Sequence, residues 1–293
     1  PPPFFFHEQP AIPDAQESRG LGDVYKRQLL FILSSSSNFL DSNRIAVLEI
    51  NGVIDNPKNY LKSINTISKD TKIKGLIVRI DSPGGTVGSS QEIYESLKEI
   101  QKKIPVVASI IDVGASGGYL IACGAETIFA NSGSITGSIG VISQYYDASK
   151  LLEFLKFNVE ILKSGDYKDS GTPTRALSET EKSLLNKLLK DIHQQFKNIV
   201  QKERRLSNQE TELVSQGQIF SGEKAKELKL VDYIGGLSKA KEFVLNKVGE
   251  GDMELDIFPK KEGKLIDKII PETLKINSLE SILFKKMLYL YTP

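Results

Sequence analysis

A serine flanked by small residues is the strongest candidate for a nucleophile in this sequence. Residues 114–119 read Gly-Ala-Ser-Gly-Gly-Tyr, so the hydroxyl of Ser116 is open to the close approach of a substrate backbone. The apolar residues that follow predict a short helix beginning at Ser116, where unpaired amide groups and the helix dipole favour a developing anion. The pattern Gly-x-Ser-x-Gly also matches the nucleophile turn of α/β-hydrolases. Taken alone, the match is as typical of a glycine-rich turn as of an enzyme.

A serine hydroxyl needs a base, and histidine is scarce in this chain. The sequence has two histidines, and His193 lies in a predicted long helix beside polar residues, so we interpret it as a surface or rim residue. A Ser-His-Asp triad therefore lacks a suitable histidine, and lysine is the remaining candidate for the base. Lys168 lies in the polar segment 164–169, which follows a predicted strand. Lysine amines are ordinarily charged at neutral pH, so such a base needs a site that removes the amine from water.

Two more polar or glycine-rich segments follow predicted strands. Residues 81–85 read Asp-Ser-Pro-Gly-Gly, and the paired glycines Gly84 and Gly85 let a backbone amide point into a cleft, as an oxyanion hole requires. Residues 132–141 carry several hydroxyl groups that are able to hydrogen-bond a neutral lysine amine. A plain turn or a polar loop explains either segment on its own, so only the combination of all four motifs is specific.

The elements that must position these motifs alternate between strands and helices. Strands alternating with helices at a spacing of about 30 residues predict an α/β domain with crossover connections. Shorter helix and strand units are expected to continue to Val248. The apolar patterns predict strands at 45–50, 73–80, 105–110, 127–130, 139–142 and 159–162, and helices at 57–69, 88–102 and 178–205.

Composition narrows the classes of function. The chain has 293 residues and a formal net charge of +1, which provides no long-range field for nucleic acid, so no nucleic-acid partner is expected. The one cysteine, Cys123, lies in an apolar run and is interpreted as a small buried hydrophobe. Clustered metal-ligand spacing is missing from the sequence, so neither a metal nor an organic cofactor is expected.

The two ends of the chain differ from its centre. Residues 1–28 lack periodicity and end in a stretch similar to a translated sequencing adapter, so we interpret them as a non-native prefix. Residues 29–43 begin with an apolar run too short to cross a bilayer, which leaves two interpretations: a linker or the remnant of a membrane anchor. The expected catalytic domain spans 44–248, and residues 249–293 form a lysine-rich tail.

The four motifs in this order resemble the short, single-core form of signal peptide peptidase A, a family of S49 serine proteases. The motifs lie at 81–85, 115–119, 136–140 and 167–169, and the resemblance covers residues 44–248. It implies an α/β fold of the Clp-protease/crotonase type, built from repeated strand-strand-helix units. It also implies a serine endopeptidase that works without a cofactor.

The resemblance further implies a role for each site residue. Ser116 would be the nucleophile and Lys168 the general base, while the hydroxyl of Ser138 orients the lysine. The oxyanion hole would consist of Gly84 or Gly85 together with the amide of Ser116.

The family also implies a cellular setting. Its substrates would be the remnants of cleaved signal peptides at the bacterial inner membrane, with the catalytic domain facing outside the cytoplasm. An N-terminal anchor and a ring-like homo-oligomer are expected as well, although here the anchor is missing or reduced to residues 29–40.

Three alternatives remain open from the sequence. Another membrane-linked S49 peptidase, of the stomatin-associated or phage-capsid type, would use the same residues on a different substrate. A crotonase-type acyl-CoA enzyme would keep the oxyanion turn but leave Ser116 and Lys168 without roles. A catalytically silent scaffold is the third.

Overall fold

The computed structural model describes residues 42–260 and the backbone of 288–290. A compact unit begins at Arg44. Our interpretations of residues 1–28 and of the apolar run at 29–40 fall outside the described residues. Among the residues that the structure describes, no helix is both long and apolar enough to cross a bilayer.

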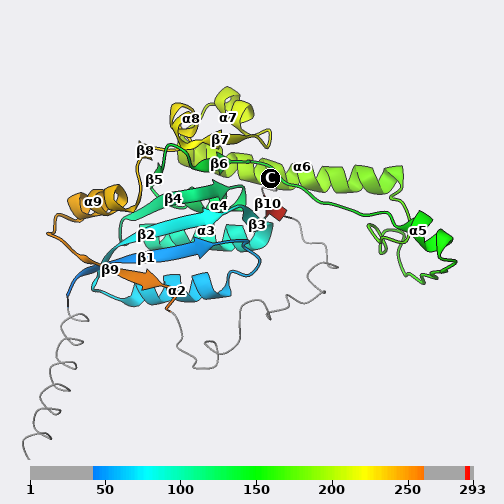
Figure 1. The fold of residues 1–293 in the computed structure, drawn as a ribbon, viewed down its shortest axis with the longest axis horizontal. Helices are drawn as coiled ribbons and strands as arrows, with labels where there is room; N and C mark the ends of the chain where they lie inside the picture. The colour runs from blue at the N-terminus through cyan, green and yellow to red at the C-terminus, as the bar shows by residue number, and fades with distance from the viewer. Residues whose placement is uncertain (1–41, 261–287, 291–293) are drawn as a thin grey trace, which may run out of the picture. The chain divides into compact units, whose positions relative to one another are not determined.

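A largely parallel β-sheet forms the centre of the unit (Figure 1). Its strands follow the order β7-β6-β4-β2-β1-β9, and β5 pairs with the first half of β4 while β6 pairs with its end. Only the β6–β7 pair in this sheet is antiparallel among the described strands. The strands are β1 (Arg44–Asn51), β2 (Ile73–Ser82), β4 (Val106–Ala115), β5 (Thr127–Ala130), β6 (Ile135–Gly137), β7 (Ile219–Ser221), β8 (Tyr233–Ile234) and β9 (Glu254–Phe258).

Helices cover both faces of this sheet. Successive side chains of a strand point to opposite faces, so Leu48 and Ile50 join the large core under α2, α3, α4 and α6. Ile45 and Val47 point the other way and pack beneath α9. The helices are α2 (Lys58–Lys69), α3 (Val87–Gln101), α4 (Gly117–Ala122), α5 (Ser149–Phe154), α6 (Glu179–Arg204), α7 (Asn208–Val214), α8 (Gly222–Glu227) and α9 (Leu237–Val248).

Most of the predicted elements are confirmed, and two predicted strands are wrong. The strand expected at 139–142 lies earlier, as β6, because Gly137 and Ser138 have φ values of 84° and 50° that turn the chain out of the sheet. The strand expected at 159–162 does not form, and its apolar side chains are exposed. The sequence also missed β9, which pairs in parallel with β1, so the sheet extends past residue 248.

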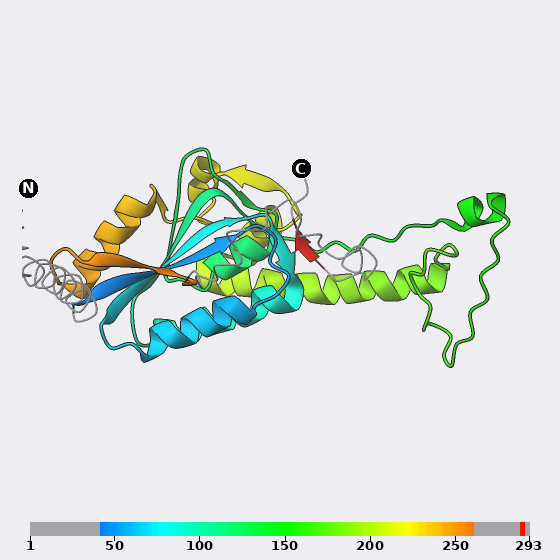
Figure 2. The same ribbon diagram turned by 60° about the horizontal axis from the view of Figure 1, so that its bottom comes forward.

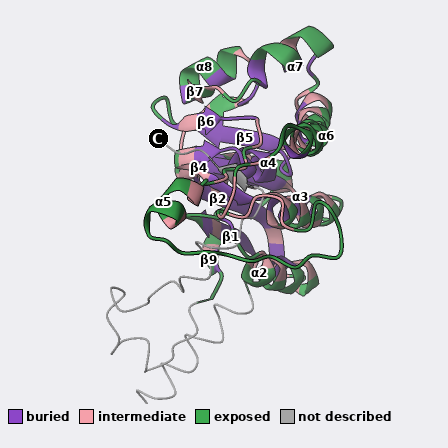
Figure 3. Ribbon diagram, turned by 90° about the vertical axis from the view of Figure 1, so that its right-hand side faces the viewer, coloured by how far each residue is buried: buried purple, intermediate pink, exposed green. Residues whose placement is uncertain are grey.

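Residues 143–190 form an arm that has almost no core of its own. Helix α5 buries none of its residues, and the single buried residue of the arm is Glu181. Figures 1 and 2 show α5 and its neighbouring loops beside the outer end of α6. Viewed from that end, the arm is largely exposed while the sheet behind it is buried (Figure 3). Only the second half of α6 joins the core, through Phe196 and Val200.

Candidate active site

Ser116 lies at the turn between β4 and α4, in a strained backbone conformation. Its φ of 53° and ψ of −118° are unfavourable for a residue with a side chain, at a cost of about 1–3 kcal/mol. Two hydrogen bonds hold the turn: the Ser116 N–H donates to Gly137 O at 2.8 Å, and Ser116 O accepts from Leu120 N at 2.9 Å. A Cβ on Gly118 would lie 2.8 Å from Ser82 O, so the helix can begin this close to β2 only with glycine there.

Ser138 lies next to this turn. The register pairs Ala115 of β4 with Gly137 of β6, so the two following residues, Ser116 and Ser138, leave the ends of neighbouring strands together. Ser138 is buried, and its N–H donates to Gln218 O at 2.8 Å. The structure therefore brings together the expected nucleophile and the serine expected to orient its base.

The glycines of the 81–85 motif form β3 (Gly84–Thr86), which runs beside Ile54. Ile54 N donates to Gly84 O at 2.9 Å, and Thr86 N donates to Ile54 O at 2.7 Å. A Cβ on Gly85 would lie 1.9 Å from Ile54 O, so only glycine allows this approach. Because neighbouring residues of a strand direct their backbone groups to opposite edges, the N–H of Gly85 points away from Ile54.

Ser82 holds the oxyanion turn in place from within the core. Its fully buried hydroxyl donates to Gly52 O at 2.6 Å and accepts from Gly84 N at 3.1 Å. The amide of Gly84 is therefore engaged, as is that of Ser116 with Gly137. In this single chain the Ser116 and Gly84 amides donate inside the protein, whereas the N–H of Gly85 faces the other edge of β3.

That other edge carries a short strand from the C-terminal end of the chain. β10 (Leu288–Leu290) pairs with β3 in antiparallel orientation, with Tyr289 opposite Gly85. The edge of β3 next to the nucleophile turn is thus able to accept an extended polypeptide. Sequence reasoning missed this strand, because the tail shows no pattern of alternation.

Lys168 is not brought to Ser116 within one chain. It is exposed, in a series of turns that precedes α6, and no hydrogen bond among the described residues joins it to Ser116. The neighbouring Asp169 is linked through Arg175 to Glu181, in the first turn of α6. Phe196, which anchors α6 in the core, lies about 22 Å further along that helix. Among the described residues, no contact that the structure shows joins the expected base to the expected nucleophile.

The remaining reactive side chains do not form a rival site. His193 is half-buried on α6, and its Nε2 lacks a hydrogen-bond partner among the described residues. Burial raises the pKa of Cys123 to about 12, so this thiol stays protonated. In the described part of the chain, no three His, Cys, Asp or Glu side chains gather as metal ligands do.

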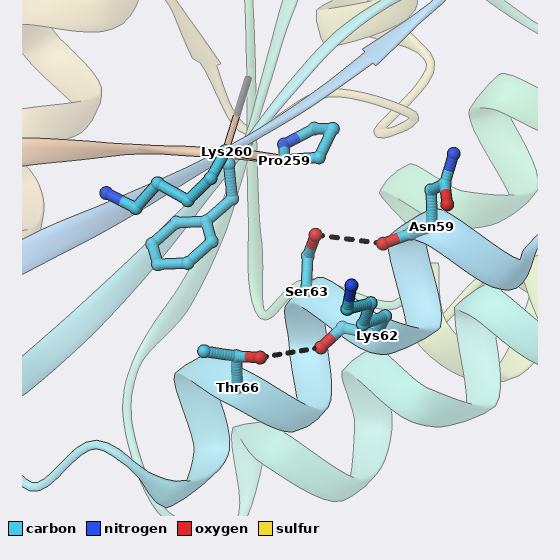
Figure 4. Close-up of a pocket in the computed structure, with 7 residues that line it drawn as sticks. Asn59, Lys62, Ser63, Thr66, Pro259 and Lys260 are labelled. Carbon is cyan, nitrogen blue, oxygen red and sulfur yellow. Dashed lines mark hydrogen bonds between the residues drawn. The ribbon is translucent and has the colours of Figure 1, made fainter. Parts of the chain in front are cut away.

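A separate polar pocket lies between α2 and the end of β9 (Figure 4). The hydroxyls of Ser63 and Thr66 at this pocket donate to carbonyls of the preceding turn of α2, at 2.8 and 3.0 Å. They are committed to the helix and offer no nucleophile. Ser116 therefore stays the candidate nucleophile among the described residues.

The fold and this turn define a hydrolase of the serine type, built on a Clp-protease/crotonase-like α/β sheet. Residues 98–248 match the model of peptidase family S49, and residues 34–133 match that of Clp protease. The chain belongs to peptidase family S49 and is a serine peptidase of the signal peptide peptidase A type.

Several known proteases are similar to most of this chain. A putative protease of Synechocystis sp. is 42% identical over 208 residues, which are 70% of this chain and 75% of that protein. The putative signal peptide peptidase SppA of Enterococcus faecium is 34% identical over 66% of this chain. The chloroplastic serine protease SPPA of Arabidopsis thaliana is 35% identical over 62% of it. The alignments span 60% of the Enterococcus protein and 27% of the Arabidopsis protein.

Proposed function

We propose that this chain is an endopeptidase in which Ser116 is the nucleophile and Lys168 the general base. The observation that carries the proposal is the strained turn at Ser116, which lies at the carboxyl end of β4 beside Ser138 and the glycines of β3. Strain of this kind persists where the surrounding structure holds it, and it is typical of nucleophile turns.

In this proposal the substrate binds to β3 as an additional antiparallel strand. The pairing of β10 with β3 supports this, because the backbone of β10 lies along the same edge as an antiparallel strand. The scissile carbonyl oxygen would accept hydrogen bonds from Gly85 N–H and from Gly117 N–H. The latter is the first amide of α4 and has no acceptor within that helix.

The proposed reaction is acyl transfer to serine followed by hydrolysis. Lys168 Nζ takes the proton of Ser116 as Oγ bonds to the carbonyl carbon, and the carbonyl oxygen gains the electron pair. The C–N bond then breaks, and the ammonium returns its proton to the leaving amine. Lys168 next deprotonates a water molecule that attacks the ester, which releases the acid and restores the hydroxyl of Ser116. Ser138 would hold the lysine amine by a hydrogen bond, and no metal or organic cofactor is required.

Lys168 would reach Ser116 from a second copy of the chain. In the single chain it is exposed, whereas an amine acts as a base only once it is removed from water. The arm that carries it exposes large apolar side chains, which favour contact with another copy in a homo-oligomer. They include Leu151, Phe154, Leu155, Phe157 and Leu162.

We propose that the substrates are remnants of signal peptides. We further propose that the protein acts at the bacterial inner membrane, with its catalytic domain outside the cytoplasm. The name of the Enterococcus relative, a putative signal peptide peptidase, supports this substrate class. Apolar peptides without stable structure suit a site that binds its substrate as a strand. Cleavage of such peptides but not of folded stomatin-like or capsid proteins would separate this role from those of other S49 peptidases.

Mixing two inactive variants tests the proposal. Ser116→Ala should abolish labelling by an alkyl fluorophosphonate and cleavage of a signal-peptide substrate, and Lys168→Ala should reduce both to a slow residual rate. When the two are mixed under conditions that exchange subunits, sites with one intact serine and one intact lysine should restore activity. Labelling that persists in Ser116→Ala would exclude the nucleophile, full activity of Lys168→Ala would exclude the base, and an inactive mixture would place both residues in one chain.

A further inference from the structure

We propose that Arg175 is a positioning residue for Lys168: it fixes the lysine-bearing turn on the N-terminal end of α6. The inference rests on the proposed role of Lys168 as the base. The arm has almost no core of its own, yet proton transfer requires the amine of Lys168 to be held in a fixed position.

Arg175 bridges two carboxylates that lie on either side of it in sequence. Its Nε donates to Asp169 Oδ2 at 3.0 Å, and Nη1 and Nη2 donate to the two oxygens of Glu181 at 2.8 and 2.7 Å. A planar guanidinium makes such paired contacts in one orientation, so the bridge sets direction as well as distance. Asp169 directly follows Lys168, which is therefore one residue away from an anchored side chain.

Glu181 connects the bridge to the helix. It forms a capping box with Ser178: the Ser178 N–H donates to Glu181 Oε2 at 2.8 Å, and the Glu181 N–H donates to Ser178 Oγ at 3.2 Å. Ser170 Oγ donates to Glu181 Oε1 at 2.7 Å, which is a second hydrogen bond between the turns around Lys168 and the first turn of α6. Hydrogen bonds from Arg175 lower the pKa of Glu181 and of Asp169, so both remain charged at neutral pH.

The backbone around Lys168 forms consecutive turns. Lys168 N donates to Gly165 O at 3.1 Å, Ser170 N to Tyr167 O at 3.1 Å, and Thr172 N to Asp169 O at 3.0 Å. Turns of this kind are not stable alone, and α5 buries no residue that could support them. Arg175 and Ser170, both through Glu181, therefore join these turns to a rigid element, and only Arg175 also holds the residue next to Lys168.

An ordinary surface ion pair is much more exposed to water than the Arg175 bridge. The pair Lys182–Glu179 lies in the same first turn of α6, with side chains that are 51% and 90% exposed. The carboxylates that Arg175 binds are 3% and 9% exposed, so water competes far less for the bridge. Lys182 is consequently a matched control for the loss of one positive charge at this place.

The test compares Arg175→Met, Arg175→Lys and the control Lys182→Met, each with intact Lys168 and in the Lys168→Ala background. The measurement is the rate of fluorophosphonate labelling of the full chain, with circular dichroism to verify the fold. With Lys168 intact, Arg175→Met should lower the rate about 10- to 100-fold, since small misplacements of catalytic groups have effects of that size. Arg175→Lys should recover only part of the loss, and Lys182→Met should leave the rate within about twofold of the parent.

The Lys168→Ala background separates positioning from general damage. If Arg175 acts through Lys168, Arg175→Met should cause no further loss there, because the residue that it positions is already gone. A normal rate for Arg175→Met, or an equal loss in both backgrounds, would overturn the inference while leaving the base in place. Full activity of Lys168→Ala by itself would instead remove the base, and the inference with it.

Discussion

The backbone N–H of Ser116 donates to the carbonyl oxygen of Gly137 at 2.8 Å, which ties the nucleophile turn to the end of the neighbouring strand β6. The bond occupies the backbone amide of the same residue that carries the proposed nucleophilic hydroxyl. It also explains how one turn can hold a strained backbone: β4 and β6 continue their pairing for one residue beyond the last registered pair.

Gly137→Ala should weaken both the fold and the activity. The φ of Gly137 is +84°, and a Cβ there would lie 2.8 Å from the ring of Phe220, so we expect a loss of about 1–2 kcal/mol from the backbone conformation alone. Urea denaturation measures the first effect and fluorophosphonate labelling the second. Gly133→Ala is the control, because nothing lies within 4 Å of its added Cβ. Equal stability of the two variants would contradict the prediction.

Ser82→Ala should damage the oxyanion turn from inside the core. The change leaves Gly52 O and Gly84 N without their partner, at an expected cost of about 1–3 kcal/mol in the free energy of unfolding. The labelling rate of Ser116 should fall as well, because Ser82 holds Gly84, and the proposed oxyanion donor Gly85 is the next residue. For comparison, Ser63→Ala removes a hydroxyl that bonds only within its own helix, and it should leave labelling unchanged. A wild-type rate in Ser82→Ala would show that the turn is held by Ile54 alone.

Cys123 should resist alkylation in the folded protein. Burial raises its pKa to about 12, so the thiol is neutral below that pH, and its side chain is inaccessible. Iodoacetamide at about pH 8 should therefore neither modify the native chain nor inhibit it, whereas the unfolded chain should react near the ordinary thiol pKa of about 8.5. Mass spectrometry measures the modification. Rapid loss of activity with iodoacetamide would point to a reactive thiol in place of the serine.

Removal of β10 should open the substrate edge of β3. A chain that ends at residue 287 should label and cleave several-fold faster, because Gly85 would no longer face Tyr289. Tyr289→Pro, which deletes one backbone N–H, should have a similar effect, and Tyr289→Ala, which keeps it, should not. Rates that match the full chain in both the truncated and the proline variant would show that β10 does not compete with substrate.

The sequence determined the elements and the nucleophile motif because these depend on local information. Apolar periodicity located β1, β2, β5 and the helices α2, α3 and α6 within a few residues. The small residues around Ser116 predicted a turn between a strand and a helix, and the structure has such a turn. The strand expected at 159–162 was wrong because an apolar run forms a strand only where a partner edge is available, and the arm has none to offer it.

Only the tertiary structure decided which groups meet. The pairing of β6 with β4 places Ser138 beside Ser116, and the amides of Ser116 and Gly84 donate to Gly137 and Ser82. Lys168 is exposed on the arm, and no hydrogen bond among the described residues joins it to Ser116. Distances between residues far apart in sequence arise from strand register and helix packing, which no local pattern encodes. The motifs therefore suggested candidate residues but not the arrangement that would join them.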